Sequence, residues 1–344
     1  MNIRSIAADP PKIATEAVAA AVAEQYGLSG NYRPLVSERD QNFQLQTENG
    51  RRYVVKIASL AEDPVVTDFQ IEALKYLQAS GLEICPQIIR TPDGDDRGVI
   101  HGKDDRLACL RIVSWLDGQR LHDAELSADI SASFGRQLAL LDRALENFSH
   151  PGERQVLLWD TQRALELRDL LQHIDDSVTR TLVEEVLDAF AERVLPRLGS
   201  LPQQVIHNDA NSENILLNEA GKVTGIIDFG DMLRAPRIVE VATAASYLRT
   251  SARDPLEYIA AFVAGYHAES ALQSSELDLL FDLIRTRLAM TLSILYWRVS
   301  ARDAGDSYRQ KSLASEAAAA DFLGRLSALG REAARRRLRA VLRR

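Results

Sequence analysis

The sequence predicts an α+β protein of two lobes, in which a small antiparallel β-sheet lobe is followed by a larger, mostly helical lobe. Between residues 32 and 58, apolar and polar residues alternate with the period of half-buried strands. From Leu121 onward, apolar residues recur every three or four positions, which is the period of amphipathic helices. A chain of 344 residues is also long enough to form two compact parts.

Composition and charge restrict the class of protein. Hydrophobic residues make up 46% and charged residues 26% of the chain, which is typical of a globular protein rather than a disordered one. The formal net charge of −8 argues against nucleic acid as a partner, because such binding relies on an excess of Lys and Arg. Cys85 and Cys109 are too few for a disulfide framework and suggest a reducing compartment.

No segment has the pattern of a signal peptide or of a membrane span. The longest apolar helical stretch, residues 279–297, is interrupted by Asp282, Arg285 and Arg287. We therefore expect a cytoplasmic protein without a membrane partner.

The sheet lobe is expected at residues 28–116, after an N-terminal arm and helix at 1–27. Glu48-Asn49-Gly50 predicts a hairpin turn between two of its strands. The expected helices lie at about 13–26 and 67–80, and the expected strands at 32–37, 41–47, 52–58, 84–91 and 107–116.

A lysine inside one of these apolar strands, Lys56, requires a partner, because an unpaired buried charge is costly. Glu72, on the following helix, is the predicted partner, with Glu62 and Asp68 as alternatives nearby. The alternative explanation is that Lys56 lies on a face of the strand that is exposed to solvent.

Residues 205–232 are the most informative stretch, because two apolar runs flank a polar turn and so predict a β-hairpin. A pairing centred on Gly221 places Asn214 opposite Asp228, where side chains are about 5 Å apart. An amide and a carboxylate are suitable oxygen ligands for Mg²⁺, which bridges to substrate phosphates. Asp209, in the preceding loop, can accept a proton from an attacking hydroxyl.

The order His-x-Asp-x-x-x-x-Asn at residues 207–214, followed by Ile-Asp-Phe-Gly at 227–230, resembles the catalytic segment of protein kinases. It is more closely similar to that of the aminoglycoside phosphotransferase and choline kinase superfamily. The resemblance covers about residues 28–300 and implies a two-lobed protein-kinase-like fold. Asn208 departs from the common small-molecule-kinase pattern, which has glycine at this position.

The resemblance implies roles for the residues of this segment. Asp209 would orient or deprotonate the acceptor hydroxyl, and His207 would brace the loop. Asn214 and Asp228 would hold Mg²⁺.

On the side of the phosphoryl donor, the resemblance implies that Lys56 reaches the phosphates of ATP or GTP and pairs with Glu72. The loop after the first strand contains no glycine, so Ser37 and neighbouring backbone N–H groups would supply the phosphate contacts. Backbone groups near Val113 and Trp115 would bind the base, at the point where the sheet lobe joins the helical lobe.

The helical lobe is expected at residues 117–329, followed by an Arg-rich helix at 330–344. That last segment has seven arginines and one glutamate, and it predicts an amphipathic helix docked on its own acidic protein. Binding to nucleic acid or to an acidic membrane is the alternative, but no aromatic residue is interleaved for stacking on bases. Further helices are expected at about 160–174, 177–196, 238–250, 254–270, 276–300 and 304–328.

Gly-Asp-Met at residues 230–232, followed by a helix near Glu240, resembles the hydroxylysine kinase branch of this superfamily. Asp231 would then receive a substrate ammonium, or would be an ordinary turn carboxylate. A favourable helix-dipole interaction suffices to explain Glu240.

The resemblance therefore implies a kinase that phosphorylates a small hydroxylated amine or amino acid. 5-Hydroxylysine is the first candidate, and homoserine, choline-like alcohols and aminoglycosides remain open. A catalytically silent kinase-like binding protein is the hypothesis from another class. Such proteins usually lose a metal ligand or the base, whereas Lys56, Asp209, Asn214 and Asp228 are all present.

Overall fold

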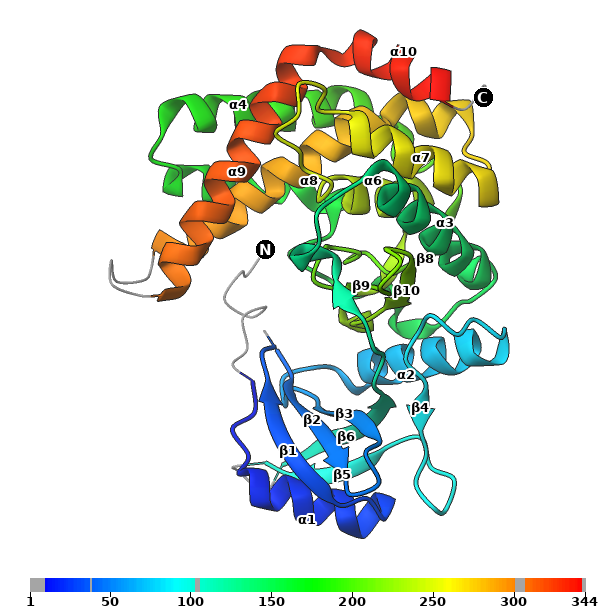
Figure 1. Cartoon of the computed structure of the whole chain (residues 1–344). Helices are drawn as coiled ribbons and strands as arrows, with labels where there is room; N and C mark the ends of the chain where they lie inside the picture. The colour runs from blue at the N-terminus through cyan, green and yellow to red at the C-terminus, as the bar shows by residue number, and fades with distance from the viewer. Residues whose placement is uncertain (1–9, 38, 103–105, 301–306, 342–344) are drawn as a thin grey trace. The chain divides into compact units, whose positions relative to one another are not determined.

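The computed structural model describes residues 10–37, 39–102, 106–300 and 307–341, with side chains for all of these except 307–316. Figure 1 shows its helices and strands and labels most of them. Residues 1–9 of the expected arm lie outside the described residues. The chain divides into two compact units, of which the first comprises 1–117, 148–155 and 225–230, and the second comprises 118–147, 156–224 and 231–344.

The first unit contains a sheet in which every strand pair is antiparallel, as predicted. The strand order is β1-β2-β3-β6-β4, and β5 also pairs with β6. The strands are β1 (Gly30–Leu35), β2 (Gln41–Thr47), β3 (Arg52–Ile57), β4 (Ile88–Ile89), β5 (Gly98–His101) and β6 (Leu107–Ser114).

Two details of this sheet differ from the prediction. The strand expected at 84–91 is only the two-residue β4, because Pro86 has no N–H to donate to a ladder. β5 was not predicted, since its four residues follow a run of turn-forming residues and are too short to show a clear alternation.

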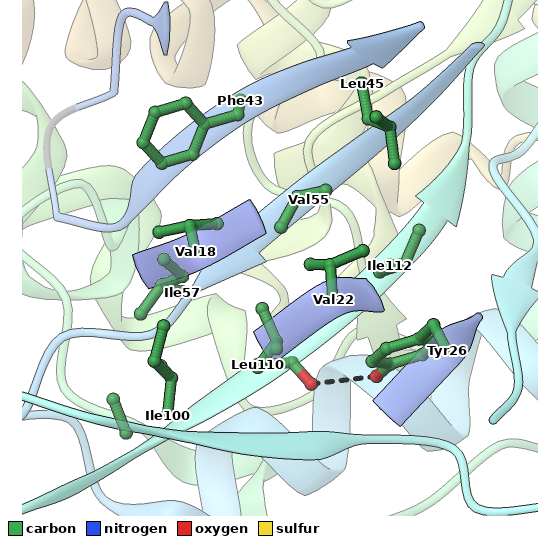
Figure 2. Close-up of a cluster of buried hydrophobic side chains, with 11 residues drawn as sticks. Val18, Val22, Tyr26, Phe43, Leu45, Val55, Ile57, Ile100, Leu110 and Ile112 are labelled. Atoms are coloured by element: carbon green, nitrogen blue, oxygen red, sulfur yellow. Dashed lines mark hydrogen bonds between the residues drawn. The ribbon is translucent and has the colours of Figure 1, made fainter. Parts of the chain in front are cut away.

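Helix α1 (Thr15–Tyr26) packs on this sheet and ends at Gly27, whose left-handed backbone forms the C-cap. Val18, Val22 and Tyr26 join the buried side chains of the strands (Figure 2). The Tyr26 hydroxyl donates a hydrogen bond of 2.9 Å to the Leu110 carbonyl, and burial raises the pKa of Tyr26 to about 12.

Helix α2 (Pro64–Ala79) has Asp63 as its N-cap, and the Asp63 side chain accepts a hydrogen bond from the Val65 N–H. Phe69 of this helix stacks on Phe148 and His150, with ring centroids 6.0 and 5.6 Å away. These contacts explain why segment 148–155, with its short η3 helix (Pro151–Arg154), belongs to the first unit.

The second unit is mostly helical, as predicted. Its helices are η2 (Leu121–Asp123), α3 (Ala128–Leu145), η4 (Thr161–His173), α4 (Ser177–Ala189), η5 (Phe190–Val194), α5 (Leu195–Leu198), α6 (Arg237–Ala245), α7 (Glu257–Glu269), α8 (Ser274–Ser300), α9 (Ser307–Leu329) and α10 (Arg331–Val341).

Two predicted helices of this unit are not regular α-helices. The segment expected as a helix at 160–174 is the 3₁₀ helix η4, in which Arg163 leaves helical backbone angles with φ −106° and ψ 15°. The helix expected at 177–196 ends as α4, and the π-helical η5 and the short α5 follow it. Pro196 cannot donate to the preceding turn, which accounts for the irregularity before it.

The β-hairpin predicted in residues 205–232 is confirmed, but its turn is centred on Ala220 and not on Gly221, because the Asn218 N–H donates to the Lys222 carbonyl at 2.9 Å. Strands β9 (Ile215–Leu217) and β10 (Val223–Ile226) pair, and β7 (Gln119–Arg120) pairs with the other edge of β9. In the turn, the Asn218 side chain accepts hydrogen bonds from the N–H groups of Ala220 and Lys222. A further antiparallel pair forms between β8 (Gln203–Ile206) and β11 (Leu233–Pro236). In this pair Ile206 lies opposite Leu233, so the segment between these two residues begins and ends at the same place.

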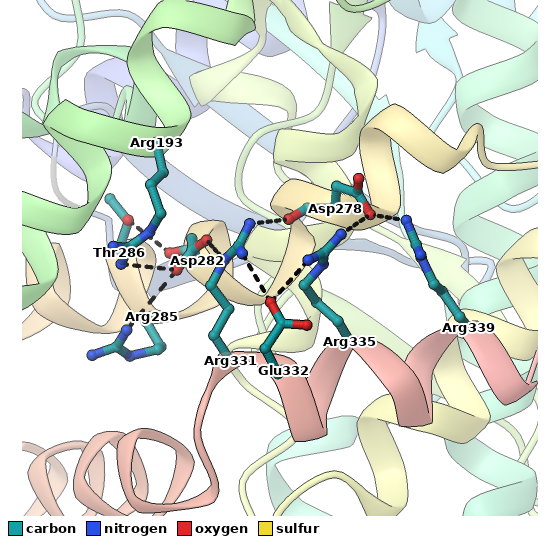
Figure 3. A network of polar contacts seen from close by, with 9 residues as sticks. All are labelled: Arg193, Asp278, Asp282, Arg285, Thr286, Arg331, Glu332, Arg335 and Arg339. Atoms are coloured by element: carbon teal, nitrogen blue, oxygen red, sulfur yellow. Dashed lines mark hydrogen bonds and ion pairs between the residues drawn. The ribbon is translucent and has the colours of Figure 1, made fainter.

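The Arg-rich helix α10 docks on acidic side chains of its own unit, as predicted (Figure 3). Arg331 donates to Asp282 at 2.7 Å, and Arg335 donates to Asp278 at 2.7 Å. Arg339 also pairs with Asp278. Residues 342–344 of the predicted segment lie outside the described residues. Within the described part of the chain, no helix combines the length and the apolar character needed to cross a membrane.

Candidate active site

The first unit holds Lys56 against the carboxylate that precedes Phe-Gly. Lys56 lies on β3, and its Nζ is 3.1 Å from Oδ1 of Asp228. The lysine side chain is 13% exposed and the aspartate side chain 49% exposed, and both residues line a small cavity. The cavity is lined by Lys56, Gln70, Leu74, Pro86, Arg111, Val113, Asp228 and Phe229.

The predicted Lys56–Glu72 pair is wrong. Glu72 lies on the exposed side of α2 and pairs with Lys75 at 2.8 Å, whereas Lys56 pairs with Asp228. The α2 residues that line the cavity with Lys56 are Gln70 and Leu74, on the same buried face as Leu77. Two positions along a helix correspond to a rotation of about 200°, so Gln70 and Glu72 point to opposite sides.

The other residues predicted on the donor side have different surroundings. Val113 is buried on β6 and lines the cavity. Trp115 follows β6, and its indole N–H donates to Asp117 at 3.2 Å. The guanidinium of Arg52 lies 5.5 Å from the Trp115 ring centroid. Ser37 is half-buried in the loop after β1.

Two residues of the predicted catalytic segment have left-handed backbones. Asn208 has φ +63° and Asp228 has φ +65°, and no other described non-glycine residue has a positive φ. Asn and Asp tolerate this conformation best after glycine, and such strain concentrates at functional sites. The left-handed backbone explains why the related pattern has glycine at the position of Asn208, and why asparagine can replace it.

In the second unit, Asp209 is held by two asparagine side chains. Asn214 Nδ2 donates to Oδ2 of Asp209 at 2.8 Å, and Asn211 Nδ2 donates to Oδ1 at 2.9 Å. The Asp209 side chain remains 24% exposed. The His207 ring is fully buried, and its Nδ1 accepts from the Asp209 N–H at 3.2 Å. This contact places His207 inside the loop, as the predicted bracing role requires.

Glu240, on α6, contacts the backbone of the same loop. It is fully buried, and its Oε2 accepts a hydrogen bond of 2.7 Å from the Asn208 N–H. Burial raises the pKa of Glu240 to about 7, while the backbone N–H of Asn208 and the charge of Arg287 oppose the shift. The helix-dipole explanation of Glu240 was therefore incomplete, because the position of a residue near a helix start does not reveal that the loop lies against it.

Arg287, on α8, is a further residue beside Asp209 that sequence reasoning missed. Its side chain is 1% exposed, and its Nη2 is 3.8 Å from Oδ1 of Asp209. Its Nη1 donates to the Trp159 carbonyl at 2.7 Å, and the guanidinium lies 4.8 Å from the Trp159 ring centroid. A charge within a long apolar helix was the available signal, since such a residue needs a partner.

The predicted metal ligands fit Mg²⁺ in their chemistry. Asp228 and Asn214 offer hard oxygen atoms, and Mg²⁺ commonly takes one or two protein carboxylates while keeping several waters. The described residues contain no group of three or more His, Cys, Asp or Glu side chains that would suit another metal. The turn hydrogen bond from the Asn218 N–H to the Lys222 carbonyl centres the hairpin on Ala220, so the register predicted from Gly221, which placed Asn214 opposite Asp228, is wrong. Asp228 belongs to the first unit and Asn214 to the second, and their joint binding of Mg²⁺ stays a prediction. Asp231, in the 3₁₀ turn η6 (Phe229–Asp231), also belongs to the second unit.

Comparison with known proteins identifies relatives over most of the chain. The model of a family described as "Phosphotransferase enzyme family" matches residues 31–277. Hydroxylysine kinase of Mus musculus is 27% identical over 304 residues, which cover 81% of each chain. Hydroxylysine kinase of Danio rerio is 25% identical over 87% of this chain and 88% of its own length.

Two solved structures share the fold. A microcompartment-associated aminopropanol kinase superposes with a TM-score of 0.71 at 17% identity, over 90% of this chain and 97% of its own. An amicoumacin kinase in complex with AMP-PNP and Ca²⁺ superposes with a TM-score of 0.69 at 15% identity, over 90% and 93% of the two chains. These similarities confirm the predicted kinase-like fold class.

Proposed function

Because this chain belongs to the phosphotransferase enzyme family, we propose that it transfers the γ-phosphoryl group of ATP or GTP to a hydroxyl of a small amine-bearing metabolite. The observation that carries the proposal is the Lys56–Asp228 ion pair, since a strand lysine beside a metal-binding aspartate is the donor arrangement of kinases. The hydroxylysine kinases that match over more than 80% of both chains support 5-hydroxylysine as the first acceptor to test.

On the donor side, Lys56 would contact the nucleotide phosphates, and its positive charge would offset the charge that develops during transfer. Asp228 and Asn214 would hold Mg²⁺, which supplies further neutralisation of the phosphate oxygens when bound. Asp228 is already ordered by Lys56 in the first unit, so little conformational freedom is lost on binding.

On the acceptor side, Asp209 would accept a hydrogen bond from the substrate hydroxyl and direct its oxygen at the γ-phosphorus. As the new P–O bond forms, the bond from the γ-phosphorus to the bridging β,γ-oxygen breaks, and the hydroxyl proton passes to Asp209. Asn211 and Asn214 hold both carboxylate oxygens, so the chain has already restricted the orientation of the base.

A carboxylate near the acceptor site would favour a substrate with a positive charge. We assign this role to Asp231, which follows the Asp-Phe-Gly turn directly. The substrate ammonium would lie against this carboxylate while its hydroxyl meets Asp209.

A nucleotide-consumption assay tests the proposal, run with Mg²⁺ and either ATP or GTP. The acceptors are 5-hydroxylysine, homoserine, choline and kanamycin, with lysine as the hydroxyl-free control for hydroxylysine. We expect turnover with hydroxylysine and none with lysine. Turnover with another member of the panel alone would reject the hydroxylysine assignment and keep the reaction class. A protein that neither consumes nor binds Mg²⁺-nucleotide would refute the reaction class.

A further inference from the structure

Arg111 contacts residues of two other elements of the first unit. It is on β6, directly opposite Lys56 of β3 in the sheet register, and its side chain is 3% exposed. Its Nη2 is 3.0 Å from Oδ2 of Asp40, in the loop between β1 and β2. The same nitrogen donates to Oε1 of Gln70, on α2, at 2.5 Å.

Gln70 extends this chain of contacts to the turn that follows Asp228. Its Nε2 lies 3.5 Å from the Gly230 carbonyl, which also accepts from Gln155 at 3.4 Å. The path from Asp40 through Arg111 and Gln70 to Gly230 therefore connects the β1–β2 loop, the sheet, helix α2 and the Asp-Phe-Gly turn. Every one of these residues belongs to the first unit.

We propose that Gln70 and Arg111 are positioning residues for the donor half of the reaction. They hold the β1–β2 loop and the turn bearing Asp228 in one arrangement around Lys56, at the place where an α2 carboxylate was expected. The proposal rests on the proposed phosphotransferase function, because it assigns these two elements to the nucleotide and its metal.

The choice of an amide at position 70 follows from its hydrogen-bonding groups. An amide accepts from Arg111 through Oε1 and donates to Gly230 through Nε2, whereas an ionised carboxylate can only accept. A glutamate here would also add a negative charge beside Asp40 and Asp228. With glutamine, the two cations Lys56 and Arg111 are balanced by the two carboxylates that contact them.

A purely structural role is the competing explanation. Buried ion pairs such as Arg111–Asp40 are weak evidence of function or of stability by themselves. The two explanations differ in what they predict for nucleotide and Mg²⁺ affinity in a variant that remains folded.

The test is calorimetric binding of AMP-PNP and GMP-PNP at several Mg²⁺ concentrations, which requires no acceptor. Gln70→Met removes both hydrogen bonds at nearly constant volume and charge, and Gln70→Glu keeps the acceptor for Arg111, removes the donor to Gly230 and adds a negative charge. Gln78→Met, at an exposed position of the same helix, is the matched control. We expect about tenfold weaker binding and a higher Mg²⁺ requirement for Gln70→Met, weaker binding also for Gln70→Glu, and no change for the control.

Wild-type affinity and Mg²⁺ dependence in both folded Gln70 variants would overturn the inference. If Gln70→Met does not fold, the near-isosteric Gln70→Glu decides the question alone. A wild-type protein that binds neither nucleotide would instead refute the proposed function, and the inference with it. Weakened binding in the Gln70 variants, with an unfolding midpoint close to that of Gln78→Met, would establish the positioning role.

Discussion

At the scale of single residues, the candidate site consists of charged groups that other side chains hold in place. Lys56 is held by Asp228, and Asp209 is held by Asn211 and Asn214. This arrangement suits phosphoryl transfer, in which positioning and charge neutralisation supply most of the rate enhancement.

Asp209→Asn should reduce turnover by at least about 10²-fold, because the amide cannot accept the hydroxyl proton. Nucleotide affinity should stay close to that of the wild type, since the change is confined to the acceptor side. Steady-state turnover and calorimetric AMP-PNP binding measure the two quantities separately. Asn211→Asp, which alters a contact of Asp209 but not the base itself, is the companion variant. Wild-type turnover in Asp209→Asn would remove this residue from its role.

Glu240→Gln should change how stability depends on pH. Burial raises the pKa of Glu240 from 4.5 to about 7, so the folded state binds more protons than the unfolded state between these values. The contribution of Glu240 to the free energy of unfolding is therefore fully present at low pH and is lost as the pH rises toward 7. The neutral variant escapes this loss, and its stability relative to the wild type should increase by about 3 kcal/mol between pH 4 and pH 8.

Urea unfolding at the two pH values measures this difference. Glu257→Gln, at an exposed position at the start of α7, is the control and should show no such trend. A difference between Glu240→Gln and the wild type that is independent of pH would contradict the assignment.

At the scale of elements, the chain often pairs a buried charge with a partner that is distant in sequence. Helix α10 shows this most clearly, because its arginines contact Asp278 and Asp282 of α8. Asp282 is only 1% exposed, so it depends on such partners for the solvation it has lost.

Arg331→Met should destabilise the second unit by about 1–3 kcal/mol, because it removes the closest cation from a buried carboxylate. Arg193 and Arg285, at 3.6 and 4.0 Å from Asp282, limit the loss. Arg336→Met, at an exposed position on the same helix, should change stability by less than about 0.5 kcal/mol. Chemical denaturation of both variants gives the comparison, and equal stabilities would show that the Arg331–Asp282 pair contributes nothing.

The sequence predicted helices and strands with a regular hydrophobic period better than it predicted which side chains contact one another. The first three strands and helix α1 follow their patterns, because alternation and helical spacing are local properties. The partner of Lys56 could not be found in this way, since Asp228 is 172 positions away. Glu72 was preferred for its charge, although the apolar spacing of α2 places Gln70, and not Glu72, on the buried face. Arg287 and Glu240 were missed because their burial depends on packing between distant segments.

At the scale of the whole molecule, a ligand that binds only the folded protein stabilises it by mass action. Mg²⁺ with ATP or GTP, at about 100 times its dissociation constant, should raise the free energy of unfolding by about 2.7 kcal/mol. Asp228→Ala should lose the Mg²⁺-dependent part of this effect. Thermal unfolding with nucleotide, with and without Mg²⁺, measures both. Equal Mg²⁺-dependent stabilisation of wild type and variant would exclude Asp228 as a metal ligand.

Neither compact unit is one continuous stretch of chain. The polypeptide passes from one unit to the other at 117/118, 147/148, 155/156, 224/225 and 230/231. During synthesis on the ribosome, the first unit therefore lacks its Asp-Phe-Gly turn until residue 230 has been added, when about two-thirds of the 344 residues have been made. The unit that contains the N-terminal sheet is therefore incomplete until residues 225–230 have been made. A gene fragment that ends at residue 117 encodes the strands without Phe148, His150 or Asp228. Neither unit can therefore be expressed, or replaced by that of a relative, as one continuous segment.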